Sequence, residues 1–264
     1  MVENRIYNGD CLSLMKDIGD GSCQLILADL PFGVLNKSNP AARWDCVLPF
    51  DELWSHYKRV IKPNGAICLF SQGLFTSRLK MSNEKMWRYD WIWHKGVYHA
   101  TGFLNANRQP MRDFETVCVF SKRQTVYHPQ KLTTGLKHKR GGNNGHSNTY
   151  GGFHKMPEVE VDAIYPRSII EQYPNDTSTA KRLHPTEKPV PLLRYLIRTY
   201  TDEGDLVLDN TCGSGSTCVA ALLEKRRFIG IEKEREYYEI ACKRVEDAER
   251  GMRSDLFNLE KQEI

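Results

Sequence analysis

The ten residues Asp209-Asn-Thr-Cys-Gly-Ser-Gly-Ser-Thr-Cys218 decide the fold of this chain. They follow a short apolar run, Leu206-Val-Leu208, which predicts a buried strand, and they precede a helix-prone segment, residues 219–225. A strand, a glycine turn and a helix start in this order form a nucleotide-type pocket, because glycine lets the backbone approach a ligand and helix amides face an anion. The stretch therefore predicts an α/β fold with a ligand at the carboxyl end of a strand.

An acidic residue follows this turn at about the twenty-residue spacing of the dinucleotide-binding fingerprint. The apolar run Phe228-Ile-Gly-Ile231 ends in Glu232, and a carboxylate there can accept hydrogen bonds from both hydroxyls of a ribose. The third glycine of G-x-G-x-x-G is absent, since Gly213 and Gly215 are followed by Cys218. This departure disfavours a nicotinamide or flavin cofactor and leaves other adenosine cofactors open.

A second strand ends in a motif that points to one family. The apolar run Gln24-Leu-Ile-Leu-Ala28 leads into Asp29-Leu-Pro-Phe-Gly33, which resembles the Asp-Pro-Pro-Tyr tetrapeptide of methyltransferases that modify exocyclic amino groups of DNA bases. Residues 209–217 resemble that family's cofactor loop, Asp-Pro-Phe-x-Gly-Ser-Gly-Thr, and His184-Pro-Thr-Glu-Lys-Pro-Val190 resembles the element just before it. The motifs occur in the order of the β group, and the resemblance covers most of the chain outside residues 121–183.

The resemblance implies a circularly permuted, S-adenosylmethionine-dependent methyltransferase fold: a Rossmann-like α/β sheet with helices on both faces and an inserted target-recognition region. It implies a catalytic domain of residues 1–120 and 184–250, a target-recognition insertion of residues 121–183, and a C-terminal tail of residues 251–264. Alternating strand and helix patterns independently predict a mainly parallel sheet. We further expect an antiparallel hairpin at the sheet edge from residues 87–99 and 115–121.

The tetrapeptide suits chemistry on an aromatic amine, which is a poor nucleophile because its lone pair is delocalised into the ring. A carboxylate that accepts one N–H, with a backbone carbonyl that accepts the other, directs the lone pair toward a methyl donor. By resemblance these acceptors are Asp29 and the carbonyl of Leu30, while Pro31 stiffens the turn and Phe32 stacks on an extruded base. Leu30 and Phe32 replace the family's proline and tyrosine but keep the acceptor and the ring.

Asp29 favours adenine N6 by family habit, and the expected enzyme is a site-specific, adenine-N6 DNA methyltransferase. Three alternatives stay open: cytosine-N4 methylation on the same scaffold, an RNA methyltransferase, and a DNA-binding module with an inactive pocket. Taken by itself, the motif could also be an ordinary turn at the end of a strand.

The resemblance also implies a site for S-adenosylmethionine. Asp209 and the amides around Gly213 and Gly215 would face its methionine part, and Glu232 would hold its ribose. The simpler alternatives are a helix cap for Asp10, a helix-start acid for Glu232 and a solvated side chain for Lys188. No metal is expected, because a sulfonium is already an activated leaving group. The cofactor-binding residues so implied are Asp10 and Cys11 near the adenine, Thr186 and Lys188 near the methionine carboxylate, and Asp209, Thr211, Gly213, Gly215 and Glu232.

Positive charge is concentrated in one part of the chain, although the net charge is only +4. Residues 121–155 contain seven Lys or Arg, no Asp or Glu, and four of the eight histidines, which is an electrostatic footprint for phosphate. The expected partner is double-stranded DNA, and the alternative is a solvated basic loop. The candidate DNA-binding residues are Lys122, Arg123, Lys131, Lys137, Lys139 and Arg140.

The remaining features bear on compartment and partners. The eight cysteines form no C-x-x-C pair, so reduced thiols are expected. The chain has no membrane-length apolar run and no signal-peptide pattern, which predicts a cytoplasmic protein. Arg253-Ser-Asp-Leu-Phe257 resembles the Gln-Leu-Ser/Asp-Leu-Phe peptide that binds the bacterial sliding clamp, without its leading glutamine; a helix end is the favoured alternative. No motif indicates an oligomeric state, so a homodimer and a monomer both stay open.

Overall fold

The computed structural model describes residues 1–35, 44–96, 99–140, 146–147, 151–152, 159–173 and 187–260. The chain divides into two compact units, of which the first is Met1–His128 with Ser168–Ile264 and the second is Pro129–Arg167. The second unit lies within the predicted insertion. Residues 121–128 and 168–173, also assigned to that insertion, belong to the first unit.

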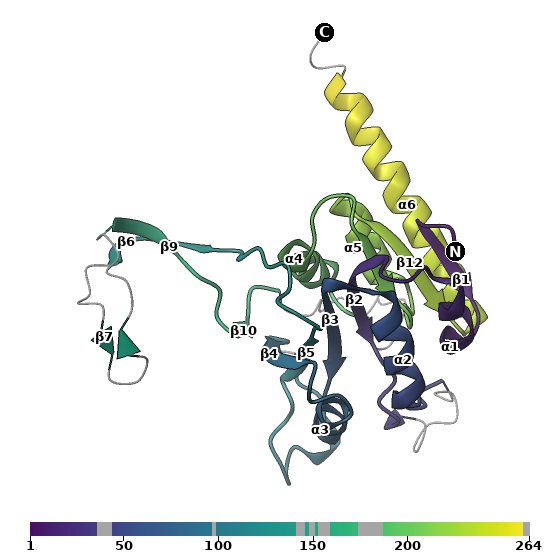
Figure 1. Ribbon diagram of the computed structural model, residues 1–264, viewed down its shortest axis with the longest axis horizontal. Coiled ribbons are helices and arrows are strands. Elements are labelled where there is room, and N and C mark those ends of the chain that lie inside the picture. Colours follow the sequence, from purple (N-terminus) through teal and green to yellow (C-terminus); the bar gives the residue numbers. More distant parts are fainter. Residues whose placement is uncertain are drawn as a thin grey trace. The chain divides into compact units, whose positions relative to one another are not determined.

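An eight-stranded sheet forms the centre of the first unit (Figure 1), with the order β1-β12-β11-β2-β3-β5-β4-β10. Every neighbouring pair is parallel except those of β5, which runs antiparallel to both β3 and β4. The predicted antiparallel pair is therefore present, with β10 outside it at the edge. The strands are β1 (Arg5–Asn8), β2 (Cys23–Asp29), β3 (Ile61–Ser71), β4 (Trp87–His94), β5 (Phe114–Phe120), β10 (Ile169–Ile170), β11 (Leu206–Asp209) and β12 (Arg227–Glu232).

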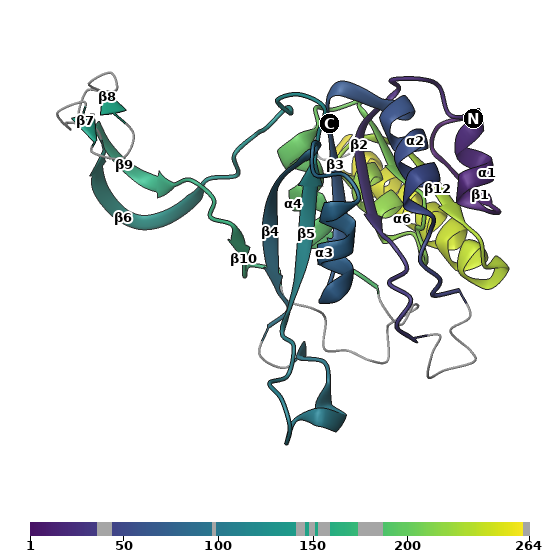
Figure 2. The ribbon, with the colours of Figure 1, turned by 60° about the horizontal axis from the view of Figure 1, so that its bottom comes forward.

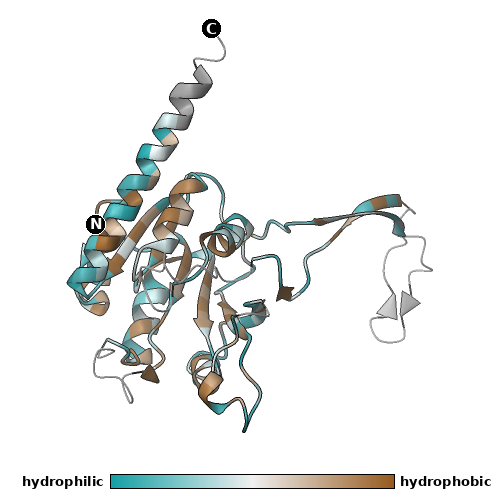
Figure 3. Cartoon of the chain, turned by 180° about the vertical axis from the view of Figure 1, so that it is seen from behind, coloured by the Kyte–Doolittle hydropathy of each residue, from teal (hydrophilic) through white to brown (hydrophobic). Residues whose placement is uncertain are grey.

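Helices cover both faces of this sheet, as predicted, and each face has its own apolar core. The central strand β2 is buried along six consecutive residues because both of its faces are covered, and Figure 3 shows the strands as largely hydrophobic. One core packs Leu53 and Tyr57 against the sheet, and the other packs Leu196 and Tyr200. The first face carries α1 (Cys11–Leu14), η1 (Met15–Asp17), α2 (Phe50–Val60) and α3 (Leu74–Met81); the second carries α4 (Val190–Tyr200), α5 (Ser216–Leu223) and α6 (Arg235–Glu260).

The first and the last strand of the chain are neighbours in the sheet. Strand β1 pairs with β12, and Arg5 lies opposite Ile229, as expected if the fold is circularly permuted. From β11 the chain continues through α5 to β12 on one side, whereas β2 continues through α2 to β3 on the other. The strand order thus reverses between β11 and β2, and ligands of such sheets bind at this switch point, beyond the carboxyl ends of the strands.

Strand β3 contains Pro63-Asn64-Gly65, a sequence typical of turns. The proline lies in a bulge of the pairing between β2 and β3. Cys23 pairs with Ile61 and Leu25 pairs with Ala66, so residues 62–65 of β3 bulge out between these two pairs. A side chain at Gly65 would lie 2.8 Å from the carbonyl oxygen of Gln24. The bulge therefore depends on glycine at this position.

Helix α6 continues past residue 250, where the catalytic domain was expected to end. It extends to Glu260, so the backbone of Arg253–Phe257 is helical, in keeping with the helix-end alternative. Sliding-clamp binding stays an untested prediction. Among the described residues, no helix is both long and apolar enough to cross a membrane.

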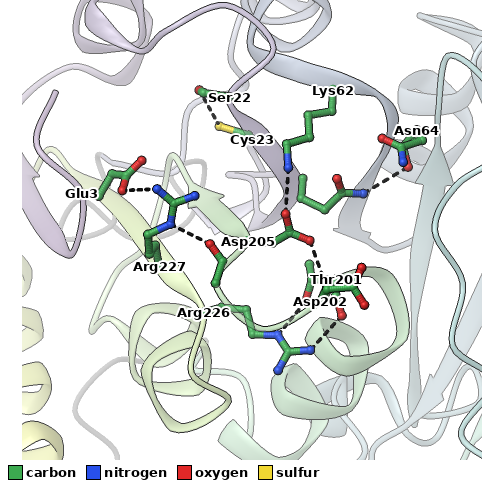
Figure 4. A network of polar contacts seen from close by, with 12 residues as sticks. Glu3, Ser22, Cys23, Lys62, Asn64, Thr201, Asp202, Asp205, Arg226 and Arg227 are labelled. Carbon is green, nitrogen blue, oxygen red and sulfur yellow. Dashed lines mark hydrogen bonds and ion pairs between the residues drawn. The ribbon is translucent and has the colours of Figure 1, made fainter.

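Ion pairs tie together the amino ends of the strands, opposite the switch point (Figure 4). Lys62 Nζ lies 2.7 Å from Asp205 Oδ1, and Arg227 Nη1 lies 2.5 Å from Glu3 Oε2. Arg227 Nε also donates to the carbonyl of Gly204 at 2.6 Å. These side chains are partly exposed, so each pair contributes little stability by itself. Their position assigns them to the fold and not to a ligand site.

The second unit contains two small antiparallel sheets, β6 (Leu132–Arg140) with β9 (Val159–Ile164), and β7 (His146–Ser147) with β8 (Gly151–Gly152). Lys139 of β6 lies opposite Glu160 of β9, and Lys137 Nζ is 3.9 Å from Glu160 Oε2. The basic strand predicted to bind DNA therefore pairs with an acidic one.

Candidate active site

A cavity of about 1020 Å³ lies at the carboxyl ends of β1, β2, β11 and β12. This volume is at the upper end of the range for small-molecule sites, so it can hold a cofactor together with a substrate group. Gly215 is not in the wall, and Thr186 is outside the described residues. The predicted residues that line the cavity are Asp10, Cys11, Asp29, Leu30, Pro31, Phe32, Lys188, Asp209, Thr211, Gly213 and Glu232.

Asp29 ends β2 and forms an ion pair that its motif did not reveal. Its Oδ2 accepts a hydrogen bond from Lys188 Nζ at 2.5 Å. Its other oxygen, Oδ1, is buried and has no hydrogen-bond partner among the described residues. One oxygen of the carboxylate is thus fixed, and the other is available to a donor in the cavity.

The charges continue beyond Lys188 in an alternating chain. Lys188 Nζ lies 3.2 Å from Glu115 Oε2, and Glu115 Oε1 lies 2.7 Å from Lys95 Nζ. The side chains of Lys95, Glu115 and Lys188 are between 6% and 11% exposed, so solvent screens these pairs weakly. Two acids and two bases balance, which is the condition under which buried charges are tolerated.

The network determines how Asp29 titrates. Burial raises the pKa of Asp29, Lys188 lowers it in part and Glu115 raises it again, which leaves the pKa at about 6. Burial also acts on the pKa of Glu115, but the two lysines outweigh it and hold that pKa below its ordinary value. Lys188 shows the converse: burial lowers its pKa, yet Asp29 and Glu115 leave it raised. Lys188 is therefore a cation at neutral pH, and Asp29 titrates close to neutrality.

Phe32 has one side supported by the protein. Its ring lies 4.8 Å from that of Phe75 on α3, and it borders the cavity. The backbone just after Phe32 is held by Asp45, which accepts hydrogen bonds from the amides of Gly33 at 3.0 Å, Val34 at 2.7 Å and Leu35 at 2.6 Å. The chain that continues from this segment is described at residue 35 and again from residue 44 onward, and both parts line the cavity.

The glycine turn is shaped by contacts within the protein. Glu232 Oε2 accepts the amide of Gly213 at 2.8 Å, and the amide of Gly215 donates to Cys212 at 2.8 Å. These two amides, which we expected to face a ligand, are thus already bonded. Gly215 has a φ of +81°, and an added Cβ would lie 2.9 Å from the Cβ of Ala241 on α6. Glycine is needed here for a left-handed backbone and for close packing of the turn on that helix.

The two acids beside this turn are buried at the cavity. Asp209 is 4% exposed and Glu232 is 9% exposed. Burial raises the pKa of Asp209 to about 7, although a hydrogen bond from Thr217 opposes the rise. Burial likewise raises the pKa of Glu232, against the amides of Glu234 and Gly213. Two buried acids with raised pKa values are a recurrent mark of a functional site.

Asp10 and Cys11 lie at the start of α1, on the rim of the same cavity. Asp10 Oδ1 accepts the amide of Ser13 at 3.0 Å, so the helix-cap alternative is confirmed for this residue. Cys11 is held from β11, because Asn210 Nδ2 lies 3.6 Å from its sulfur and Asn210 Oδ1 accepts the hydroxyl of Tyr57 at 2.6 Å. The cap leaves the role of Asp10 toward a cofactor as a prediction.

The predicted DNA-binding residues are divided between the two units. Lys122 donates to the carbonyl of Ile61 at 3.1 Å and thereby holds the start of β3. Lys131 lies 5.0 Å above the ring of Tyr165 within the second unit, and Lys137 is close to Glu160 there. Lys122 and Arg123, which belong to the first unit, are not among the residues that line the cavity.

The comparisons with known proteins decide the family. The profile of a family described as DNA methylase matches residues 23–243, most of the chain. The chain belongs to this DNA methylase family.

Individual DNA methyltransferases are similar along most of their length. Type II methyltransferase M2.MboI of Moraxella bovis is 26% identical over 92% of this chain and 87% of its own. The solved structures include the M1.HpyAVI–SAM complex, with a TM-score of 0.61 and 23% identity over 91% of this chain and 98% of that one. They also include the cytosine-N4-specific PvuII DNA methyltransferase, with a TM-score of 0.64 and 19% identity over 98% and 92% of the two chains. These structures support the methyltransferase fold.

DNA methylases use S-adenosylmethionine, and the cavity fits this group. Its wall carries a buried acid at the end of β11, Asp209, and another at the end of β12, Glu232, beside a turn that a side chain at Gly215 would disrupt. Among the described residues no group of His, Cys, Asp and Glu could hold a metal ion. The eight cysteines, all of them described, are free thiols.

Several residues at the site were not identified from the sequence. Arg244 of α6 clamps the glycine turn, since its Nη1 donates to the carbonyl of Ser214 at 2.8 Å and its Nη2 lies 2.6 Å from Glu187 Oε1. Glu187 could have been found, because it lies inside the motif that precedes the cofactor loop. Arg244, Lys95 and Glu115 carry no local pattern, and only the folded chain brings them to the site.

Proposed function

We propose that this DNA methylase transfers a methyl group to N6 of adenine in double-stranded DNA. The observation that carries the proposal is the free Oδ1 of Asp29, buried in the cavity wall while Lys188 holds the other oxygen. An ionised carboxylate is purely a hydrogen-bond acceptor, and an exocyclic amine is a donor of matching chemistry. The cavity therefore has an acceptor ready for an amino group.

In this mechanism Asp29 Oδ1 accepts one N–H of the target amine, and the backbone carbonyl of Leu30 accepts the other. The nitrogen lone pair then turns out of the ring plane toward the methyl donor. A sulfonium methyl donor would lose its sulfur–carbon bond as the nitrogen–carbon bond forms, with sulfur keeping the electron pair. The methylated nitrogen then gives up a proton, which Asp29 is placed to receive at Oδ1. A carboxylate with a pKa of about 6 can take up a proton and release it again near neutral pH.

Phe32 supplies the stacking surface for the extruded base. Phe75 supports the ring of Phe32 from within the protein, while Phe32 itself borders the cavity. An aromatic platform of this kind offsets part of the stacking that the base loses on leaving the duplex. Phenylalanine provides the ring without the hydroxyl of the family's tyrosine.

S-adenosylmethionine supplies, when bound, a methyl group activated by a sulfonium. We assign the ribose to Glu232, the methionine part to Asp209 and Thr211, and the adenine to Asp10 and Cys11. Lys188 is better suited to positioning Asp29 than to binding the methionine carboxylate, because its ammonium already faces Asp29 and Glu115.

Adenine N6 is proposed over cytosine N4 because an aspartate, and not a serine, stands at position 29. The fold does not discriminate, since the similar PvuII enzyme is cytosine-N4-specific. We assign target recognition to residues 121–183. We also propose that the protein acts in the cytoplasm. A restriction-modification setting is inferred from the Type II relatives.

Expression in a host without DNA methylation tests the proposal. Nucleosides from its DNA are analysed by mass spectrometry, and long-read sequencing of the same DNA identifies the recognition sequence. We expect N6-methyladenine in the wild type and none with an Asp29→Ala control. N4-methylcytosine would overturn the choice of base. No modification, together with no binding of S-adenosylmethionine in calorimetry, would favour the DNA-binding module with an inactive pocket.

A further inference from the structure

The connection between β4 and β5 exposes apolar side chains to an unusual extent. Phe103 is 77% exposed, Leu104 is 94% exposed and Met111 is 39% exposed. Residues 101–112, here called the β4–β5 tip, contain Arg108 and Arg112 but no Asp or Glu. Apolar side chains together with cations only are unusual for a loop that simply faces water.

The backbone of the β4–β5 tip is nevertheless well organised. Thr101 and Arg112 exchange two backbone hydrogen bonds of 2.7 and 2.8 Å at its base. The tip itself forms the 3-10 turn η5 (Phe103–Asn105), and the carbonyl of Asn105 accepts the amides of Arg108 at 2.8 Å and Gln109 at 3.0 Å. The loop is therefore folded through its own backbone while its largest apolar side chains remain in solvent, as in a preformed binding element.

The position of the β4–β5 tip links it to the active site. Ala100, Thr101, Gly102 and Arg112 line the cavity that contains Asp29. Figure 2 shows the loop extending beyond the carboxyl end of β4 and the amino end of β5. The base of the tip therefore forms part of the wall of the cavity that contains Asp29.

We propose that the β4–β5 tip is a wedge that enters the DNA duplex, with Phe103 and Leu104 filling the space that the extruded base leaves. The inference rests on the proposed function, because it needs a base that leaves the stack. Apolar side chains such as Phe and Leu are those that proteins insert between base steps. Arg108 and Arg112 flank them and suit the phosphates beside the gap.

Charge favours DNA over a second copy of this chain as the occupant. A tip with two arginines and no acid matches a polyanion, whereas the chain as a whole carries a net charge of +4 and would repel a basic tip. A stable protein interface also needs about 800 Å² per partner, which is more than two apolar side chains provide. A gap of one base in a stack is of the matching size.

The test uses duplexes that contain the mapped recognition sequence, either fully paired or with an abasic site opposite the target base. The variant is Phe103→Ser with Leu104→Ser. Its control is Leu74→Ser with Met81→Ser on α3, where two apolar side chains are 67% and 72% exposed. Single-turnover methyl transfer, cofactor affinity and gel filtration are measured for each protein.

We expect the wedge variant to lose about tenfold or more of its rate on the paired duplex, because extrusion becomes harder. On the abasic duplex its rate should approach that of the wild type, since no pairing holds the target base there. Cofactor affinity and the control variant should be unchanged. In paired duplexes with 2-aminopurine at the target position, the rise in emission on binding should be seen with the wild type and be lost with the variant.

Three outcomes would overturn the wedge: no loss on the paired duplex, an equal loss on both duplexes, or a change from dimer to monomer in the variant. The last would make the tip a self-association surface. Methylation of the paired duplex by the wild type reports separately on the proposed function.

Discussion

The two carboxylate oxygens of Asp29 have different surroundings: Lys188 binds Oδ2, whereas Oδ1 has no partner among the described residues. Mutation of Asp29 tests the role of Oδ1. Replacement by alanine removes the acceptor for the target amine but leaves the glycine turn, Asp209 and Glu232 in place. We expect methyl transfer to fall about a hundredfold or more, the loss typical of one polar group aligned with a reacting centre. Asn keeps an acceptor without the charge and should retain more activity than Ala.

Single-turnover rates together with calorimetry of S-adenosylmethionine binding check this prediction. The cofactor affinity of Asp29→Ala should stay close to that of the wild type. A turnover equal to the wild type would mean that Asp29 is part of an ordinary turn, and the mechanism would be wrong.

Lys188 should control the pH dependence of the reaction. The charged groups with the largest effects on the pKa of Asp29 are Lys188 and Lys95, which lower it, and Glu115, which raises it. Asp209 also interacts electrostatically with Asp29. Methyl transfer needs the ionised carboxylate, so its rate should rise with pH through about 6. Lys188→Gln removes the main lowering influence and should move this rise to higher pH.

Glu115→Gln is the matched control, because loss of this acid lowers the pKa of Asp29 and should move the same rise to lower pH. The rate of methyl transfer is followed from pH 5 to pH 9 for the three proteins. A Lys188→Gln variant with an unchanged pH profile but weaker binding of S-adenosylmethionine would return Lys188 to the methionine carboxylate.

The predictability of individual residues follows from how local their signal is. Asp29 and Glu232 end strands inside motifs, and the structure brings both to one cavity, as the motifs predicted. Glu115 and Lys95 also lie at strand ends, but no motif surrounds them, and they matter only because Lys188 arrives from a distant part of the chain. For the same reason the sequence suggested a solvated Lys188 as its simpler alternative.

At the scale of elements, the packing of the glycine turn on α6 can be measured by a pair of alanine substitutions. Gly215 and Gly204 share a φ of +81°, but only a Cβ at Gly215 would meet a neighbour, Ala241, at 2.9 Å. Gly204→Ala should cost about 1–2 kcal/mol for the left-handed backbone alone. Gly215→Ala should cost about 1 kcal/mol or more beyond that, because turn and helix must move apart.

Thermal or denaturant unfolding measures both variants, and S-adenosylmethionine titration reports on the turn. Only Gly215→Ala should also weaken cofactor binding. Equal losses of stability in the two variants would mean that the close approach to α6 has no energetic weight.

Strands and helices were predicted well where a local sequence pattern sets their bounds. They were predicted less well where pairing with a distant strand sets those bounds. Strand β11 occurs where the apolar run before the glycine turn predicts it, because that signal is local. Strand β3 includes a proline because the bulge opposite β2 accepts it. Strand β10 is two residues long and exists through pairing with β4, which no local sequence pattern indicates.

At the scale of the whole molecule, the distribution of charge changes on folding. Residues 121–155 are basic and free of acids in sequence, yet β9 places Glu160 opposite Lys139 in the second unit. A linear scan of charge does not detect this, because the neutralising acid comes later in the chain. The basic strand is therefore a weaker attractor of phosphate than its sequence suggests, and Glu160 becomes an informative control.

The basic side chains of β6 should contribute to DNA affinity. Replacement of Lys137, Lys139 and Arg140 by Ala should weaken DNA binding and flatten its dependence on salt, since each phosphate contact contributes about 0.9 to the slope of log affinity against log salt. We expect the slope to fall by the equivalent of about one to three phosphate contacts, because Glu160 already offsets part of the positive charge. Glu160→Gln should have the opposite effect, with tighter binding and a steeper slope.

Fluorescence anisotropy over a salt series measures DNA binding by both variants. The control replaces Lys16, Lys58 and Arg250 by Ala, which removes the same charge from exposed positions of the first unit. A slope that matches the wild type in the first variant, or a loss as large in the control, would show that β6 does not contact the DNA backbone.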